Sequence, residues 1–455
     1  MKIIIVGDGK VGYSLAETLA VDGNEVTIID RNMDTLKKTV ENLDVMCICG
    51  TGVSASILIK SGVKEADLLI AVTNSDEMNM VCCLTAKKLG ARHIIARIRD
   101  MQYADELNQL TTDLGLDMVI NPERAVAREI ARILEFPPAL KIETFARGRV
   151  DMVEIEVTGA MEISDMPLKQ ISKKYAHSIL IGAVLRSGNA IIPNGDFIIR
   201  KGDIIYIVGR LARLNDFCRK IGIFIPKVKS AMLIGGGRVA YYLGKYLEDI
   251  GIDYSIIERE HNRCTDLAAE LPSAIIIHGD GSDDSLLKSE NISEMSAFVS
   301  VTGHDEDNLI SALLAKQFGV SKVIAKISRL TYSGIMQKLG IDNIVNPKQI
   351  TANAIAQYVR GLENAMGNPV KTLYQIVEGQ AEALEFIVTS NSRLINIPLK
   401  RMVLKPGVLI AVITRGNNII IPHGNDKVQT GDSVIVITTG HRFTDLNGIL
   451  EVVNK

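Results

Sequence analysis

The sequence predicts an α/β fold in which a doubly wound parallel sheet, followed by a small α+β module, occurs twice. Apolar segments of strand length alternate with amphipathic segments of helix length across short loops, which is typical of parallel sheets. Ile, Val, Leu and Ala must form most of the core, because aromatic residues make up 4% of the chain and Trp is absent. The motifs of the first half recur in the second half in the same order.

The first sheet is predicted from the order of its strands and helices. We expect strands at residues 2–6, 25–30, 44–49, 68–72, 94–97 and 118–120. We expect the intervening helices at residues 11–22, 32–42, 53–60, 76–89 and 101–110. A longer amphipathic helix should begin at Pro122, which suits a first helical turn, and end near Leu134. Its predicted apolar stripe consists of Ala125, Ile130, Ile133 and Leu134.

A small α+β module is predicted after this helix, because strand patterns and turn residues replace the alternation of strands and helices. Its strands are expected at residues 150–157, 179–186, 190–192 and 204–208, with a helix at 210–220. Residues 187–189 and 201–203 carry turn chemistry. The four domains are accordingly expected at residues 1–143, 144–226, 227–369 and 370–455.

The second half repeats both parts. In the sheets, the corresponding positions are Gly50 and Gly279, Thr73 and Thr302, Asp76 and Asp305, Asn79 and Asn308, and Asn121-Pro122 and Asn346-Pro347. In the small modules, they are Pro167-Leu168-Lys169 and Pro398-Leu399-Lys400, Ile191-Ile192-Pro193 and Ile420-Ile421-Pro422, and Gly202-Asp203 and Gly431-Asp432.

The first copy opens with a glycine-rich nucleotide-binding fingerprint directly after its first strand. Gly7, Gly9 and Gly12 would allow a tight turn, close approach of a pyrophosphate, and close packing of the following helix. The N–H groups that begin this helix would face the phosphates. Asp30 would accept hydrogen bonds from ribose hydroxyls and repel a 2′-phosphate, which favours NAD(H) or an adenosine nucleotide over NADP(H). The adjacent Arg31 weakens that exclusion.

The second copy carries the same kind of fingerprint. Its residues are Gly235, Gly236, Gly237 and Ala240, followed by Glu258 and Arg259. Ala is tolerated at the third position of the motif, so a binding site is expected, with a degenerate structural copy as the alternative. The other predicted contacts within the fingerprints are Asp8, Lys10, Val11, Arg238 and Val239.

Loops after other strands are also expected to line the two crevices, because ligands bind at the carboxyl edge of a parallel sheet. The alternative is that these loops are simple turns. The predicted residues are Gly50, Thr51, Thr73, Asn74, Gly279, Asp280 and Thr302. Arg97 and Lys326 end the fifth strands, where a cation could meet phosphate or make a domain contact.

Several other classes of function are disfavoured. The net charge is −2 and there is no basic tract, so nucleic-acid binding is not expected. No apolar run approaches the roughly 20 residues that span a bilayer, and a strand at residue 2 leaves no room for a signal peptide, so a soluble protein is expected. The six cysteines are expected to be buried free thiols, and no histidines have metal-ligand spacing. The small modules offer no convergent catalytic set, so we expect sensing, with neither an enzyme nor a metal site.

The sequence resembles the TrkA family, cytosolic regulators of Trk-type potassium uptake that are built from tandem RCK domains. The resemblance covers essentially the whole chain. It rests on the doubled fingerprint with Asp30 and Glu258, the Asn-Pro pair that opens a helix after each sheet, and the repeated Pro-Leu-Lys, Ile-Ile-Pro and Gly-Asp motifs. Ala240 and Gly50-Thr51, where relatives often carry an acid, depart from the family pattern.

The resemblance implies NAD(H) at both fingerprints, with ATP or ADP as the alternative ligand. The implied contacts are Gly7, Gly9, Gly12, Asp30, Gly235, Gly237, Ala240 and Glu258. It also implies a homotetramer that docks on the cytoplasmic face of a potassium-translocating membrane subunit. An NAD-dependent oxidoreductase and a nucleotide-binding regulator of a different ion transporter remain open as alternatives.

Overall fold

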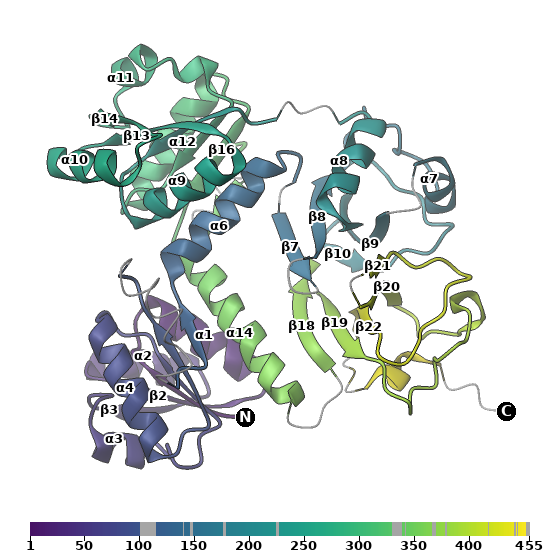
Figure 1. Cartoon of the computed structure of the whole chain (residues 1–455), viewed down its shortest axis with the longest axis horizontal. Coiled ribbons are helices and arrows are strands. Elements are labelled where there is room, and N and C mark those ends of the chain that lie inside the picture. The colour runs from purple at the N-terminus through teal and green to yellow at the C-terminus, as the bar shows by residue number, and fades with distance from the viewer. Residues whose placement is uncertain are drawn as a thin grey trace. The chain divides into compact units, whose positions relative to one another are not determined.

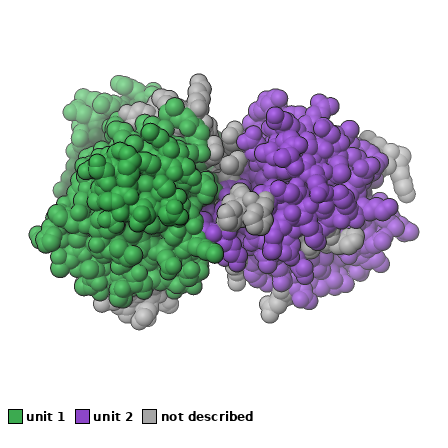
Figure 2. All heavy atoms as spheres, turned by 90° about the horizontal axis from the view of Figure 1, so that it is seen from above, with its two compact units in different colours: residues 1–131, 229–356 green, residues 132–228, 357–455 purple. Residues whose placement is uncertain are grey.

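The computed structural model describes most of the chain as two compact units. The described residues are 1–100, 115–139, 141–145, 149–175, 179–223, 227–329, 339–341, 343–365, 370–377, 380–416, 418–440, 443 and 445–451. The helix expected at residues 101–110 lies outside them. One unit comprises residues 1–131 and 229–356, and the other comprises residues 132–228 and 357–455 (Figure 2). The first unit contains both parallel sheets and the second contains both small modules.

The first parallel sheet, of which Figure 1 labels β2 and β3, has the strand order β3-β2-β1-β4-β5-β6. Its strands are β1 (Lys2–Val6), β2 (Glu25–Asp30), β3 (Met46–Cys49), β4 (Leu68–Ala71), β5 (His93–Arg97) and β6 (Met118–Ile120). The described helices of this copy are α1 (Lys10–Val21), α2 (Met33–Asn42), α3 (Ala55–Lys60), α4 (Asp76–Leu89) and α6 (Pro122–Glu135). The strand order reverses between β1 and β4, and doubly wound folds bind ligands in the crevice at such a reversal.

The second parallel sheet repeats this order as β14-β13-β12-β15-β16-β17. Its strands are β12 (Ser230–Ile234), β13 (Asp253–Glu258), β14 (Ile275–His278), β15 (Ala297–Ser300), β16 (Lys322–Lys326) and β17 (Asn343–Val345). Its described helices are α9 (Arg238–Ile250), α10 (His261–Glu270), α11 (Asp284–Ser289), α12 (Asp305–Gln317) and α14 (Pro347–Ala365). The predicted fold class, a repeated Rossmann-like sheet with small α+β modules, is therefore confirmed.

Each small module is an antiparallel sheet with short helices. The first sheet, ordered β10-β9-β11-β8-β7, contains β7 (Lys141–Phe145), β8 (Val150–Glu156), β9 (Ile179–Arg186), β10 (Asn189–Ile191) and β11 (Ile204–Gly209). Its helices are α7 (Leu168–Tyr175) and α8 (Leu211–Lys220). The second sheet, ordered β18-β19-β22-β20-β21, contains β18 (Val370–Ile376), β19 (Ala381–Ile387), β20 (Val408–Arg415), β21 (Asn418–Ile420) and β22 (Ser433–Thr439).

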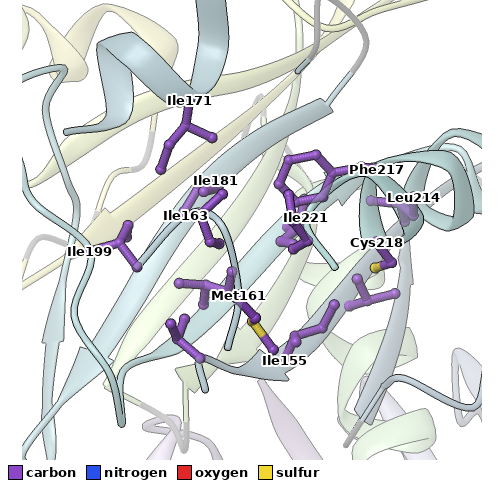
Figure 3. Packing of buried hydrophobic residues seen from close by; sticks show 14 of the residues in the cluster. Ile155, Met161, Ile163, Ile171, Ile181, Ile199, Leu214, Phe217, Cys218 and Ile221 are labelled. Atoms are coloured by element: carbon purple, nitrogen blue, oxygen red, sulfur yellow. The ribbon is translucent and has the colours of Figure 1, made fainter. Parts of the chain in front are cut away.

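The burial of the strands explains their sequences. Helices cover both faces of the parallel sheets, so all four residues of β4 and of β15 are buried and both strands are apolar throughout, apart from Ser300. The core of the first small module lies on one face of its sheet, where Ile155 and Ile181 pack with Ile171 of α7 and Phe217 of α8 (Figure 3).

The two small modules pack against each other through the other faces of their sheets. Phe145 and Met152 of the first module share a buried apolar cluster with Ala383 and Ile437 of the second. Hydrogen bonds also join each module to a hairpin turn of the other. The amide of Gln380 donates to the carbonyl oxygen of Gly188 at 2.8 Å, and the guanidinium of Arg149 donates to that of Gly416 at 3.0 Å.

Helix α6 connects the two parallel-sheet copies within their unit. The amide of Asn121 donates to the hydroxyl of Tyr242 at 3.0 Å, and the guanidinium of Arg124 donates to the hydroxyl of Tyr246 at 3.3 Å. Both tyrosines lie on α9, directly after the second glycine loop. The helix that ends the first copy therefore contacts the helix that would hold a ligand of the second.

The structure departs from the predictions in a few places. Strand β7 and helix α7 were not predicted, since each is short and has only two or three apolar residues. Ala125 is only half-buried, and Val126 and Ala127 take its place on the buried face of α6. The domain boundary proposed at residue 143 falls inside β7. No helix among the described residues is long and apolar enough to cross a membrane.

Candidate nucleotide-binding site

The three glycines of the first loop have three different structural roles. Gly7 has a φ of +107°, a conformation that other residues rarely adopt, and its N–H donates to the carbonyl oxygen of Ile29 at 2.8 Å. A Cβ at Gly12 would lie 1.8 Å from the carbonyl oxygen of Gly7, so only glycine allows helix and loop to pack this closely. A Cβ at Gly9 would meet nothing within 4 Å. Open space therefore lies where α1 begins, at the position that suits a phosphate group.

The second loop has the same arrangement. Gly235 has a φ of +95°, and Gly237 precedes α9 with open space above it. Ala240 is completely buried, so the helix accommodates one methyl group at the third position. A Cβ at Gly236 would lie 2.5 Å from Leu267, whereas the first copy has Asp8 at the corresponding position.

In each copy the acid at the end of the second strand is fixed to the glycine loop. The carboxylate of Asp30 accepts a hydrogen bond from the N–H of Asp8 at 2.7 Å and one from the N–H of Asn32 at 2.8 Å. The carboxylate of Glu258 accepts from the N–H of Gly236 at 2.5 Å and from that of Glu260 at 2.8 Å. Each carboxylate is thereby oriented beside the loop and retains lone pairs for ribose hydroxyls.

The crevice of the second copy contains a pocket of about 310 Å³. Seven of the predicted residues line it, namely Gly235, Gly237, Glu258, Arg259, Gly279, Asp280 and Thr302. Gly281 and Gly303, which belong to the two loops expected to line this crevice, also contribute to it. The other lining residues were not predicted, namely Ile234, Ile257, Ser282, Val301, His304, Asp307 and Ser311. Gly236, Arg238, Val239, Ala240 and Lys326 are not among the residues that line this pocket. The volume is at the lower end of the range for small-molecule sites.

A buried asparagine orders the loop after the fourth strand in each copy. The side-chain oxygen of Asn79 accepts from the N–H of Thr73 at 2.8 Å, and its NH₂ group donates to the carbonyl oxygens of Thr73 at 3.2 Å and Arg97 at 2.9 Å. Asn308 makes the same three contacts, with Thr302 and Lys326. The repeat had indicated that these residues correspond, but their role follows only from the structure.

The cations at the ends of the fifth strands brace the sheets. Arg97 is buried and donates to the carbonyl oxygen of Thr73 at 2.5 Å and to the side chain of Asn74 at 3.4 Å. Lys326 donates to the carbonyl oxygen of Val301 at 3.1 Å. Burial lowers the pKa of both groups. The carboxylate of Glu123, on α6 of the first copy, acts against this lowering at Lys326. The predicted roles of the two cations in a phosphate contact or a domain contact stay predictions.

The remaining predicted residues of the first crevice are divided between its interior and its rim. The carboxylate of Asp8 is buried and accepts from the hydroxyl of Thr39 on α2 at 2.7 Å, and burial raises its pKa. Lys10 is exposed and Val11 half-buried in the first turn of α1. A Cβ at Gly50 would lie 2.8 Å from Ile57. The rim also holds Arg31, which donates to the hydroxyl of Thr51 at 3.0 Å.

The cysteines are only partly as predicted. Four of them are buried, but Cys49 is exposed and Cys47 is half-buried, because both lie on β3, the edge strand of the sheet. Burial raises the pKa of the Cys47 thiol to about 11. Within the described ranges, no group of three or more His, Cys, Asp or Glu side chains could hold a metal ion.

Two Rossmann-like domains with paired glycine-loop crevices, each joined to an α+β module, define a tandem protein of the RCK type. Residues 3–122 and 231–347 match the TrkA-N domain, and residues 152–222 and 383–448 match the TrkA-C domain. The chain belongs to the TrkA family.

Relatives align with the chain over nearly its full length. The Trk system potassium uptake protein TrkA homolog 1 of Methanosarcina mazei is 37% identical, over 96% of this chain and 97% of its own. TrkA of Haemophilus influenzae is 33% identical, over 96% and 95%. The GsuK channel bound to NAD superposes with a TM-score of 0.63 at 18% identity, over 96% of this chain and 77% of that one, which shows a shared fold.

Proposed function

We propose that this chain is a regulatory subunit of a Trk-type potassium uptake system. Each crevice binds one adenosine nucleotide, and the preferred ligand is NAD(H). The observation that carries the proposal is the matched geometry of Asp30 and Glu258, each held by two backbone N–H groups beside an open glycine loop. The names of the relatives, all Trk system potassium uptake proteins, support the transport role. A GsuK channel bound to NAD supports the ligand.

The residues present fit a dinucleotide. The N–H groups at the start of α1 and α9 would hold its pyrophosphate in the open space at Gly9 and Gly237. The carboxylates of Asp30 and Glu258 would accept hydrogen bonds from the adenosine ribose. ATP or ADP would use the same contacts, so the geometry supports it as the second ligand.

We infer that the nucleotide acts as a signal. Occupation of a crevice would alter how its sheet packs on α6 or α14, and α6 is hydrogen-bonded to α9 of the other copy. A ligand shifts such an arrangement only if it binds two conformations with different affinity. A preference of about fivefold to 150-fold is the usual range of coupling.

We also propose a homotetramer that docks on a potassium-translocating membrane subunit at the cytoplasmic face of the membrane. Exposed apolar residues support assembly through α4 and α12. Val81 is 49% exposed and Ile310 is 51% exposed, and they occupy corresponding positions on these two helices. Sedimentation of the purified chain tests the tetramer, and co-purification from native membranes identifies the transporter.

Calorimetry with NAD⁺, NADH, NADP⁺, ATP and ADP tests the binding proposal. We expect Asp30→Ala to weaken binding at one site and Glu258→Ala at the other, about tenfold or more, since each removes hydrogen bonds to a charged acceptor. Unchanged affinity in both variants would refute the site. Consumption of NADH in the presence of metabolites would instead favour an oxidoreductase.

A further inference from the structure

We propose that the two crevices differ in the adenosine nucleotides that they accept: the second rejects a ribose 2′-phosphate, and the first tolerates one. The inference rests on the proposed nucleotide binding. It concerns the arginine that follows each ribose-binding acid, Arg31 in the first copy and Arg259 in the second.

In the second crevice, carboxylates occupy both ends of the guanidinium. Nη2 of Arg259 lies 2.8 Å from Oδ1 of Asp280, and Nη1 lies 3.5 Å from Oδ2 of Asp307. All three residues line the pocket together with Glu258. Asp280 is held in place, because the N–H and the hydroxyl of Ser282 both donate to its Oδ1, at 2.9 and 2.7 Å. The hydrogen bond from Arg259 lowers the pKa of Asp280 to about 2, so this carboxylate is ionised at neutral pH.

In the first crevice, the corresponding arginine has a neutral neighbour. Nη2 of Arg31 donates to the hydroxyl of Thr51 at 3.0 Å, and this is the one hydrogen bond that its guanidinium makes to the described part of the chain. Thr51 corresponds to Asp280 in the repeat, and Met78 corresponds to Asp307. The remaining N–H donors of Arg31 are therefore available to a ligand.

This difference decides how each site treats an extra phosphate. Dinucleotide folds that accept NADP(H) do so with an arginine near the ribose, since a guanidinium binds phosphate through charge-assisted hydrogen bonds. Arg31 can make such bonds and so offset the repulsion of a 2′-phosphate by Asp30, the acid that corresponds to Glu258. At Arg259, a 2′-phosphate must displace two carboxylates and then lie beside Glu258, Asp280 and Asp307, which repel it. The acids at positions 280 and 307 thus act as specificity-determining residues.

Chains with a single active crevice test the proposal. Gly237→Val leaves only the first crevice, and Gly9→Val leaves only the second. A Cβ at either glycine has nothing within 4 Å, so the added side chain enters the phosphate space without a clash at its first atom. The dissociation constants of NAD⁺ and NADP⁺ are measured by calorimetry at one ionic strength. We expect the ratio of the NADP⁺ constant to the NAD⁺ constant to be at least about tenfold larger for the second crevice.

Moving the acids from the second crevice to the first should move the rejection of NADP⁺ with them. Asp280→Thr with Asp307→Met in the Gly9→Val chain should lower the ratio about tenfold, and Thr51→Asp in the Gly237→Val chain should raise it. Asp284→Asn, which removes an acid on α11 that does not line the pocket, is the control and should leave the ratio unchanged.

Equal ratios in the two single-crevice chains, or no response to the exchange, would overturn the inference while leaving nucleotide binding intact. Failure of NAD⁺ to bind either chain would overturn the proposed function itself. If a valine variant does not fold, as judged by circular dichroism, the binding stoichiometries of NADP⁺ and NAD⁺ are compared on the wild-type chain. NADP⁺ should then saturate one site per chain at a concentration where NAD⁺ saturates two, and equal stoichiometry would contradict the inference.

Discussion

Asn79 joins the ends of two neighbouring strands, since its amide donates a hydrogen bond of 2.9 Å to the carbonyl oxygen of Arg97 while its oxygen accepts one from Thr73. Asn308 repeats the connection in the second copy, with 2.8 Å to the carbonyl oxygen of Lys326. These buried residues hold the carboxyl edge of each sheet, where the crevice lies, in one conformation.

We predict that Asn79→Leu destabilises the first parallel-sheet domain by about 2–4 kcal/mol, because it leaves several buried backbone groups without partners. Urea denaturation and hydrogen exchange of the β4 and β5 amides measure this loss. Asn42→Ala, at an exposed position on α2, is the matched control and should change stability by less than about 0.5 kcal/mol. Equal stability of the two variants would show that the hydrogen bonds of Asn79 do not stabilise the ends of these strands.

Gly12 and Gly9 of the first loop should respond differently to substitution by valine. Gly12→Val places Cβ 1.8 Å from the carbonyl oxygen of Gly7, so we expect a loss of about 3 kcal/mol or more in stability. Gly9→Val meets open space and should cost about 1 kcal/mol or less while abolishing binding at that crevice. Thermal unfolding and nucleotide titration of both variants separate the two effects. Nucleotide binding by Gly9→Val would show that the phosphates lie elsewhere.

The ion pair of Arg186 and Asp203 should make the first small module sensitive to acid. Asp203 is almost fully buried and accepts two hydrogen bonds of 2.7 Å from Arg186. Burial alone would raise the pKa of Asp203, but the bonds from Arg186 and from the N–H of Arg200 lower it overall. The folded-state pKa is thus below the unfolded one, so this stabilisation is complete above about pH 4 and is lost as the pH falls through the folded value.

We predict that Arg186→Gln costs about 2–4 kcal/mol at pH 7, because it leaves a buried carboxylate without its cation. The cost should shrink as the pH falls and Asp203 becomes protonated. Denaturation midpoints of wild type and variant between pH 7 and pH 2 test this. A difference that does not depend on pH would mean that the pair contributes packing and not charge.

The hydroxyl of Tyr242 should couple the two crevices. Tyr242→Phe removes the hydrogen bond from Asn121 and should cost only about 0.5–1.5 kcal/mol in stability. If α6 couples the two crevices, binding of one NAD⁺ changes the affinity of the other crevice for NAD⁺. This change should be smaller in the variant than in wild type. Tyr241→Phe, one residue earlier on the same helix, is the control. Identical coupling in all three proteins would exclude this route.

Much of the fold could be predicted because it depends on local patterns. The lengths of the strands, the glycine loops and the acids Asp30 and Glu258 are visible in the sequence, and each feature recurs in the second copy. Strand β7 and helix α7 were missed because eight residues or fewer carry little periodicity.

The missed parts of the site depend on contacts between distant residues. Nothing near Arg259 in the sequence shows that Asp280 and Asp307 surround it, since the sheet brings three separate loops together. A buried Asn79 looks like any polar residue of a helix until its partners at Thr73 and Arg97 are known. The packing of the two small modules on each other likewise depends on which sheet faces meet.

The fluorescence of NADH mixed with the purified chain tests the central claim most directly, because it reports binding and consumption together. We predict saturation at two NADH per chain, one in the Gly237→Val variant, and a bound signal that stays constant with time. Absence of binding, or a steady loss of NADH, would contradict the conclusion that both crevices bind a nucleotide as a regulatory ligand.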